Sequence, residues 1–221
     1  MIDLTLIIPA KNESESLPIV LKNLKNISCS VIVSLPKDDL STINSIKKYD
    51  VQIIKQVENG YGSALVEGIR NCKTKYFCIF NADGSFDSDD LYKMYDLVKS
   101  NDFVYASRYL KNGGSEDDTL ITLFGNKIFS LMCKILFSLK INDVLYTYVM
   151  GVTERFNNLN ITSKDFRFCV EVPIKMQRKK YSYSSLPSYE KKRIAGIKKV
   201  NNLKDGFLIL CEIIKLFFLK N

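Results

Sequence analysis

The feature that most constrains this chain is a short apolar run that ends in a cluster of carboxylates. Residues 76–80 (YFCIF) are too few for a typical helix, and their aromatic and β-branched side chains predict a buried strand. Asn81, Asp83 and Asp87 follow it within seven residues. Oxygen ligands at the carboxyl end of a strand suit Mg²⁺ or Mn²⁺, and α/β proteins bind their ligands at that end. A solvated Asp-Gly turn before the next helix explains the same residues equally well.

The charge balance indicates an anionic partner. The 221 residues include 32 Lys and Arg against 24 Asp and Glu, which gives a net charge of +8. Such a surface favours nucleic acid, a phosphorylated ligand or an acidic membrane. The chain has no histidine, so acid–base and metal chemistry must depend on carboxylates.

Length and cysteine usage indicate a cytoplasmic protein. The length allows one domain or two small ones. The six cysteines form no CxxC motif and mostly lie in apolar runs, as expected for core residues in a reducing cytosol. The N-terminus begins a strand without a signal peptide, and we expect no apolar run long enough to span a bilayer.

Strand-like and helix-like segments alternate through the first half of the chain. The pattern predicts strands at 4–9, 30–34, 51–57, 76–80 and 102–107, separated by helices at 15–26, 39–49, 63–72 and 89–99. This order predicts an α/β fold, with a mostly parallel central sheet flanked by helices. The turn around Gly60 and Gly62 would fit a phosphate cradle, but two glycines at this spacing also serve ordinary tight turns.

The second half differs in character. Residues 111–118 (KNGGSEDD) are glycine-rich and charged, and we expect a mobile loop there. A long helix at 119–139 carries a broad apolar face, for which packing against the core is the default explanation. We then expect a strand at 146–153, a helix at 168–180, an extended segment at 181–189, a basic loop at 191–199 and a closing helix at 205–219.

Several motifs occur in an order and spacing that are specific as a set. They are LIIPAKNE at 6–13, GYGSA at 60–64, Asn81-Ala82-Asp83, Ser107-Arg108-Tyr109, Asp143, Glu171 and Arg193-x-x-Gly196. With these motifs the chain resembles the family 2 glycosyltransferases, most of all the branch related to dolichol- and polyprenyl-phosphate sugar transferases. The resemblance covers nearly the whole chain. It implies a single GT-A-type domain over 1–221, with a nucleotide-sugar half at 1–109 and an acceptor half, α+β in character, at 110–221.

The resemblance also implies an activity. It is an inverting transfer of a sugar from a UDP- or GDP-linked donor to a polyprenyl phosphate, of undecaprenyl or dolichyl type, assisted by Mg²⁺ or Mn²⁺. Asp83 would hold the metal and, with Arg108 and Asp143, would act in catalysis. A hydroxyl acceptor would need a carboxylate such as Asp143 to take its proton. The nucleotide sugar would contact Pro9, Ala10, Lys11, Glu13, Gly60, Gly62, Asn81, Ala82 and Asp83. The acceptor phosphate would contact Arg108, Arg193 and Lys198.

Three departures from the family pattern matter. Asn81 stands where the family has its first aspartate. The aspartate pair expected after the second strand is lost or displaced to Asp38 or Asp39. The transmembrane hairpin of many lipid-phosphate transferases is missing, which leaves peripheral attachment to an anionic membrane surface, or to a membrane-protein partner. The lysine-interleaved terminal helix is compatible with such an interface.

Other interpretations remain open from the sequence alone. The same donor chemistry could act on a saccharide hydroxyl in cell-surface polysaccharide synthesis, and Asn81 is compatible with a non-catalytic relative. The net charge would suit a nucleic-acid-binding domain, but no motif of that kind occurs, so we expect no nucleic acid partner. Arg108 could pair with Asp117 or Asp118 instead of a phosphate, and the basic run at 191–199 could be a solvated face.

Asn81→Asp is expected to be tolerated and to tighten Mn²⁺ binding, because it restores the carboxylate pair that a hard cation prefers. Calorimetric titration of donor binding against Mn²⁺ measures the effect. A large loss of activity in a folded variant would show that the amide has a task of its own.

Overall fold

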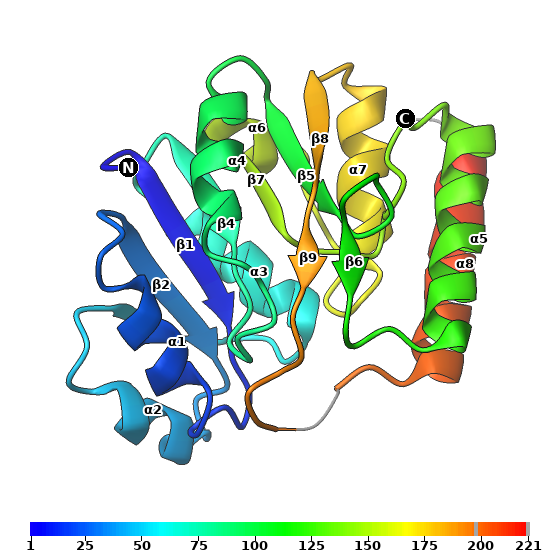
Figure 1. The fold of residues 1–221 in the computed structure, drawn as a ribbon. Helices are drawn as coiled ribbons and strands as arrows, with labels where there is room; N and C mark the ends of the chain where they lie inside the picture. The colour runs from blue at the N-terminus through cyan, green and yellow to red at the C-terminus, as the bar shows by residue number, and fades with distance from the viewer. Residues whose placement is uncertain (197–198, 220–221) are drawn as a thin grey trace.

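The computed structural model describes residues 1–196 and 199–219 (Figure 1). Its centre is a seven-stranded sheet in the order β3-β2-β1-β4-β7-β5-β8. The strands are β1 (Leu4–Pro9), β2 (Ser30–Leu35), β3 (Gln52–Lys55), β4 (Tyr76–Ile79), β5 (Phe103–Ser107), β7 (Val149–Val152) and β8 (Tyr183–Pro187). The predicted α/β fold and mostly parallel sheet are confirmed, with small shifts at the ends of the elements.

The parallel strands bring distant loops to one edge of the sheet. β1 lies between β2 and β4, with Leu6 opposite Val31 on one side and Cys78 on the other. Because all three strands run in the same direction, the segments after Pro9 and Ile79 leave from neighbouring strand ends. β7 enters between β4 and β5 as an antiparallel strand, and β8 then pairs with β5 in parallel.

Helices cover both faces of the sheet, as Figure 1 shows. The helices are α1 (Leu17–Leu24), α2 (Leu40–Ile46), α3 (Tyr61–Arg70), α4 (Asp90–Val98), α5 (Leu120–Phe137), α6 (Thr153–Asn157), α7 (Phe168–Arg178) and α8 (Asn202–Phe218). Alternate residues of β1 point to opposite faces: Leu6 and Ile8 join the core beneath α1, α2 and α4, and Ile7 joins the core beneath α3 and α7.

The glycine-rich segment at 111–118 is held in place, contrary to the expectation of a mobile loop. Within it, β6 (Gly114–Ser115) pairs in parallel with β9 (Tyr189–Glu190). Ser115 Oγ donates to a carboxylate oxygen of Glu190 at 2.6 Å. The loop is therefore joined to the chain that follows β8 and forms part of one wall of the molecule.

The expectation for the long helix is also corrected. Only 17% of α5 is buried, and the side chains on its inner face include Asn126, Ser130 and Cys133. Phe129, Met132, Leu136 and Phe137 pack against the core, but other large apolar side chains, such as Phe124 at 68% exposure, face outward. Among the described residues, α5 is also the one helix long and apolar enough, by length and composition, to cross a membrane, so the expectation that no such run exists was wrong.

The start of α3 depends on a close backbone approach. A Cβ on Gly62 would lie 2.4 Å from the carbonyl oxygen of Ser163 and 2.8 Å from that of Asp165. That loop cannot retreat easily, because the buried carboxylate of Glu171 accepts from Ser163 N at 2.8 Å. Gly62 thus lets α3 begin directly against the 163–165 backbone.

Gly62→Ala is expected to lower the free energy of unfolding by about 1–3 kcal/mol through this overlap. Gly125→Ala is the matched control, since Gly125 is also helical and a Cβ there would meet nothing within 4 Å. It should raise stability by up to about 1 kcal/mol through helix propensity. Urea unfolding of both variants measures the difference. Equal stability of the two would contradict the packing argument.

Candidate active site

A cavity of about 730 Å³ opens at the carboxyl ends of β1 and β4. The predicted donor residues that line it are Pro9, Ala10, Lys11, Glu13, Gly60, Asn81, Ala82 and Asp83. Gly62 is the exception, because it is buried against the 163–165 backbone and does not reach the cavity. The two loops that carry most of these residues meet because their strands are hydrogen-bonded neighbours.

The loop after β1 is positioned by polar side chains. Glu13 accepts from Ser16 Oγ at 2.6 Å, and its backbone N–H donates to Thr42 Oγ1 at 3.0 Å. Asp39 caps α2 and accepts from the backbone N–H of Asn12 at 2.7 Å. The aspartate displaced from the second strand therefore holds the loop backbone, and it does not line the cavity.

Asp83 lies in the acidic loop that follows β4, and it lines the cavity. One carboxylate oxygen, Oδ1, accepts from the backbone N–H of Ser85 at 3.0 Å. The other lies 3.7 Å from Nη1 of Arg193. The amide nitrogen of Asn81 donates to Ser85 Oγ at 3.1 Å, which leaves its amide oxygen as the acceptor of that side chain. Asn81 and Asp83 therefore offer one amide oxygen and one carboxylate to the same cavity.

This donor set fits a divalent cation that takes its remaining ligands from elsewhere. Mg²⁺ in phosphate-transfer sites is held by one or two carboxylates together with substrate phosphates and water. Within the described residues, no group of three or more acidic or cysteine side chains could enclose a metal without such help. Asp83 and Asn81 thus suit a metal that arrives with a diphosphate.

The basic segment after β9 runs along the acidic loop. The backbone N–H of Lys191 donates to Ser85 O, and that of Ile194 donates to Asp83 O, both at 2.8 Å. Arg193 Nη2 donates to Asp117 at 2.9 Å. Burial alone would lower the pKa of Arg193, but its hydrogen bond to Asp117 and the charges of Asp83 and Asp117 raise it. This placement puts Arg193 beside Asp83 at the edge of the cavity.

Lys199 adds a second cation to this corner, with its Nζ 3.3 Å from a carboxylate oxygen of Glu13. Arg193 and Lys199 both line the cavity. Lys198, the third residue predicted to meet the acceptor phosphate, lies outside the described residues. The basic run is therefore paired with carboxylates of the site and is more than a solvated face.

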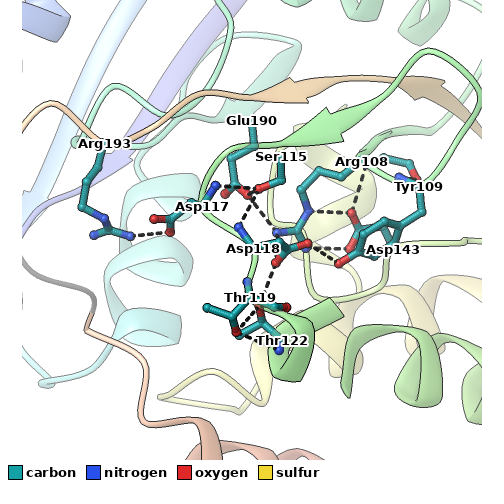
Figure 2. A network of polar contacts seen from close by, with 11 residues as sticks. Arg108, Tyr109, Ser115, Asp117, Asp118, Thr119, Thr122, Asp143, Glu190 and Arg193 are labelled. Atoms are coloured by element: carbon teal, nitrogen blue, oxygen red, sulfur yellow. Dashed lines mark hydrogen bonds and ion pairs between the residues drawn. The ribbon is translucent and has the colours of Figure 1, made fainter. Parts of the chain in front are cut away.

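Arg108 belongs to a buried polar network (Figure 2). Its Nε and Nη2 donate to the two oxygens of Asp143 at 2.8 and 2.9 Å. Its Nη1 donates to Glu190 at 3.0 Å and reaches Asp118 at 3.4 Å. Burial would lower the pKa of Arg108, but hydrogen bonding to Asp143 and the nearby carboxylates raise it.

This network changes two expectations. Arg108 lines the cavity, but three carboxylates already take its guanidinium, so it is not free to hold an acceptor phosphate. Asp143 is 0% exposed and does not line the cavity, so it is not placed to take a proton from a hydroxyl acceptor. The alternative ion pair of Arg108 with Asp118 is present.

Sequence reasoning gave no ligand-binding role to several polar residues of the cavity wall. Asp117, Asp118 and Glu190 present carboxylates there, and Asn126 comes from the inner face of α5. The amide oxygen of Asn126 is buried and has no hydrogen-bond partner among the described residues. The sequence signal for Asn126 is a lone amide within an otherwise apolar helical pattern. Because a buried polar group usually has a hydrogen-bond partner, such an amide could have been recognised as a candidate ligand contact.

The far part of the cavity is apolar. Its lining comes from the first three turns of α5 and α8, and its apolar residues are Ile121, Phe129, Leu203, Phe207, Ile209 and Leu210. The cavity therefore joins a charged corner at the sheet edge to an apolar lobe between two helices.

Asp143→Asn is expected to lower the free energy of unfolding by about 3 kcal/mol or more, because it breaks a buried, two-bonded ion pair. Asp118→Asn is the comparison: its carboxylate is 3.4 Å from the guanidinium and also accepts from Tyr109 Oη and Thr122 Oγ1. It should cost less, because Asp118 makes only one long contact to Arg108. Chemical denaturation measures both. A stable Asp143→Asn protein with a large loss of turnover would instead support a proton-transfer role.

Comparisons with known proteins agree with this architecture. Residues 5–160 match Glycosyl transferase family 2. Uncharacterized glycosyltransferases of Mycobacterium tuberculosis (strain ATCC 25618 / H37Rv) and Mycobacterium bovis (strain ATCC BAA-935 / AF2122/97) are each 33% identical over 106 residues. This stretch is 47% of the present chain and 48% of each relative, so the chain spans about half the length of the curated relatives it matches.

Solved structures share the fold at low sequence identity. Glucosyl-3-phosphoglycerate synthase from Mycobacterium tuberculosis, in complex with Mn²⁺, UDP and glucosyl-3-phosphoglycerate, has a TM-score of 0.75 at 10% identity, over 99% of this chain and 81% of that one. Mannosyl-3-phosphoglycerate synthase from Rubrobacter xylanophilus has a TM-score of 0.72 at 12% identity, over 96% and 72%. Neither is a polyprenyl-phosphate sugar transferase. The GT-A type of domain is confirmed, and by the match over residues 5–160 the chain belongs to glycosyl transferase family 2.

Proposed function

We propose that this chain is a metal-assisted glycosyltransferase that moves a sugar from a nucleotide sugar to a phosphorylated acceptor. The observation that carries the proposal is the cavity edge where Asp83, Glu13 and Arg193 converge at the ends of neighbouring strands. The structural relative from Mycobacterium tuberculosis binds UDP with Mn²⁺ or with Mg²⁺, which supports the same pairing here.

Asp83 and Asn81 would hold the metal. When bound, a divalent metal acts as a Lewis acid and neutralises the charge that grows on a departing diphosphate. Arg193, Lys199 and Lys11 line the same corner and would supply further positive charge. In the free protein Arg193 and Lys199 are paired with Asp83, Asp117 and Glu13, so they keep their positions until phosphates replace those partners.

The acceptor that the cavity favours is a lipid phosphate of the polyprenyl type. Its apolar lobe between α5 and α8 would take the first part of a hydrocarbon chain, and hydrophobic lining is what such a ligand requires. A lipid phosphate is already an anion, so it needs placement and no general base. The lack of need for a general base agrees with the position of Asp143, which does not line the cavity.

A hydroxyl acceptor is the second candidate, supported by a different observation. Asp118 and Glu190 line the cavity and are each 12% exposed at the side chain. A carboxylate within reach of a hydroxyl can take its proton as a sugar is transferred. A saccharide or a phosphoglycerate, the acceptor of the structural relatives, would use this arrangement.

Asp83→Ala is expected to weaken Mn²⁺-dependent binding of the donor nucleotide at least tenfold, because it removes a charged ligand. Asp87→Ala is the matched control, since Asp87 lies in the same loop but does not line the cavity. Calorimetry with UDP and GDP, with and without Mn²⁺, measures both. Unchanged binding by Asp83→Ala would mean that the metal corner is misplaced.

Turnover with three acceptors then decides between the candidates. Undecaprenyl phosphate, 3-phosphoglycerate and a neutral saccharide are offered with the donor that binds, and hydrolysis of the donor without acceptor is the control. Transfer to undecaprenyl phosphate is the expected result. Transfer only to a hydroxyl compound would replace the lipid candidate by the second one, and donor binding without any transfer would indicate a non-catalytic relative.

A further inference from the structure

The outer side of α5 and α8 is an exposed apolar surface, here called the α5–α8 face. The two helices pack together along one side of the molecule (Figure 1). A Cβ on Gly206 would lie 4.0 Å from the ring of Phe129, and the rings of Phe137 and Phe217 are 6.2 Å apart, so the helices run in the same direction. The exposed apolar side chains of this face are Leu120, Ile121, Phe124, Ile128, Leu131 and Ile135 of α5, and Leu203, Phe207, Ile214, Phe217 and Phe218 of α8.

Lysines border this face on both outer sides. At ~100° per residue, Lys127 and Lys134 lie on one side of the exposed stripe of α5, opposite the side that carries Phe129. On α8, Lys204 and Lys215 lie opposite the side that carries Gly206. Because Phe129 and Gly206 mark where the helices meet, the apolar stripes adjoin in the middle and the exposed lysines flank them.

The face carries no negative charge of its own. α5 contains no Asp or Glu. The two acidic residues of α8 are turned away: Glu212 is buried, and Asp205 is partly buried at the cavity wall. An apolar centre with cations at its borders is complementary to a partner that has an apolar interior beneath an anionic surface.

α5 must lie flat against such a partner and does not cross it. Its inner side is fixed to the domain, because Ser130 Oγ accepts from the backbone N–H of Val144 at 3.1 Å. Its N-terminus is also fixed, through the contact of Thr122 Oγ1 with Asp118 at 3.0 Å. To span a bilayer, α5 would have to give up both contacts and its packing on α7 and α8.

We propose that the α5–α8 face docks the protein onto an anionic lipid bilayer, with the apolar stripes in the interface and Lys127, Lys134 and Lys204 at the headgroups. Lys215 is paired with Glu212 at 2.9 Å and is not counted among them. A contiguous apolar surface of this kind marks an interaction site. A second copy of the chain fits less well, because it would present the same cations and no carboxylate to meet them. The apolar lobe of the cavity is lined by the first three turns of the same helices, so docking brings that lobe to the membrane. The inference does not rest on the proposed function.

Vesicle co-sedimentation of the full chain tests the proposal. The parent protein should bind vesicles of phosphatidylglycerol and phosphatidylcholine and should bind pure phosphatidylcholine much less. The double variant Phe124→Ser, Phe207→Ser should bind at least tenfold more weakly, since both rings are about two-thirds exposed and would enter the interface. Leu40→Ser is the matched control, because Leu40 is 61% exposed on α2, away from the face, and should change nothing.

The lysines give an independent measurement. Each of Lys127→Gln, Lys134→Gln and Lys204→Gln should weaken binding to the anionic vesicles by roughly fivefold, with a smaller salt dependence. Circular dichroism checks folding, and if the double Phe variant is unfolded, the lysine variants decide. Failure of the parent protein to bind anionic vesicles would overturn the proposal. So would a dimer in light scattering that the Phe substitutions dissociate while vesicle binding stays unchanged.

Discussion

The ion pair between Arg108 and Asp143 is the interaction on which the second half of the structure depends. It joins the end of β5 to the loop before β7, and the same guanidinium reaches Asp118 before α5 and Glu190 in β9. One buried cation thus holds four segments that are far apart in sequence. A guanidinium suits this task because its planar fork of donors can serve several carboxylates at once. The cost is that four of the five N–H donors of Arg108 are already used within the protein.

In the charged corner of the cavity, ion pairs hold in place the cations that could bind a phosphate. Carboxylates and cations from four segments neutralise one another there: Asp83, Asp117 and Glu13 with Arg193 and Lys199. Each ion pair keeps a cation near the position that a diphosphate would occupy. A metal that arrives with a nucleotide would replace cation contacts to Asp83, so donor binding exchanges one set of charge pairs for another and leaves no buried charge unpaired.

The two helices at the side of the molecule connect this corner to the outer surface. Side chains from their first three turns line part of the cavity, and their exposed apolar side chains form the α5–α8 face along the whole length of both helices. Asn126 lines the cavity from the inner side of α5, with a buried amide oxygen that has no partner within the described part of the chain. A site at which polar recognition and an apolar surface adjoin is suited to an amphipathic ligand.

The sequence by itself determined the α/β fold, the strands of the first half and the placement of Asp83 at a strand end, because these follow from local periodicity and parallel pairing. Through family motifs it also indicated most of the residues that line the charged corner of the cavity. Only the tertiary structure decided that β7 enters antiparallel, that Arg108 is consumed by carboxylates, and that Gly62 serves packing. It likewise decided that only part of the apolar surface of α5 packs on the core and that the rest points outward. An amphipathic pattern shows that a helix has two faces, but which one is covered depends on contacts with residues distant in sequence.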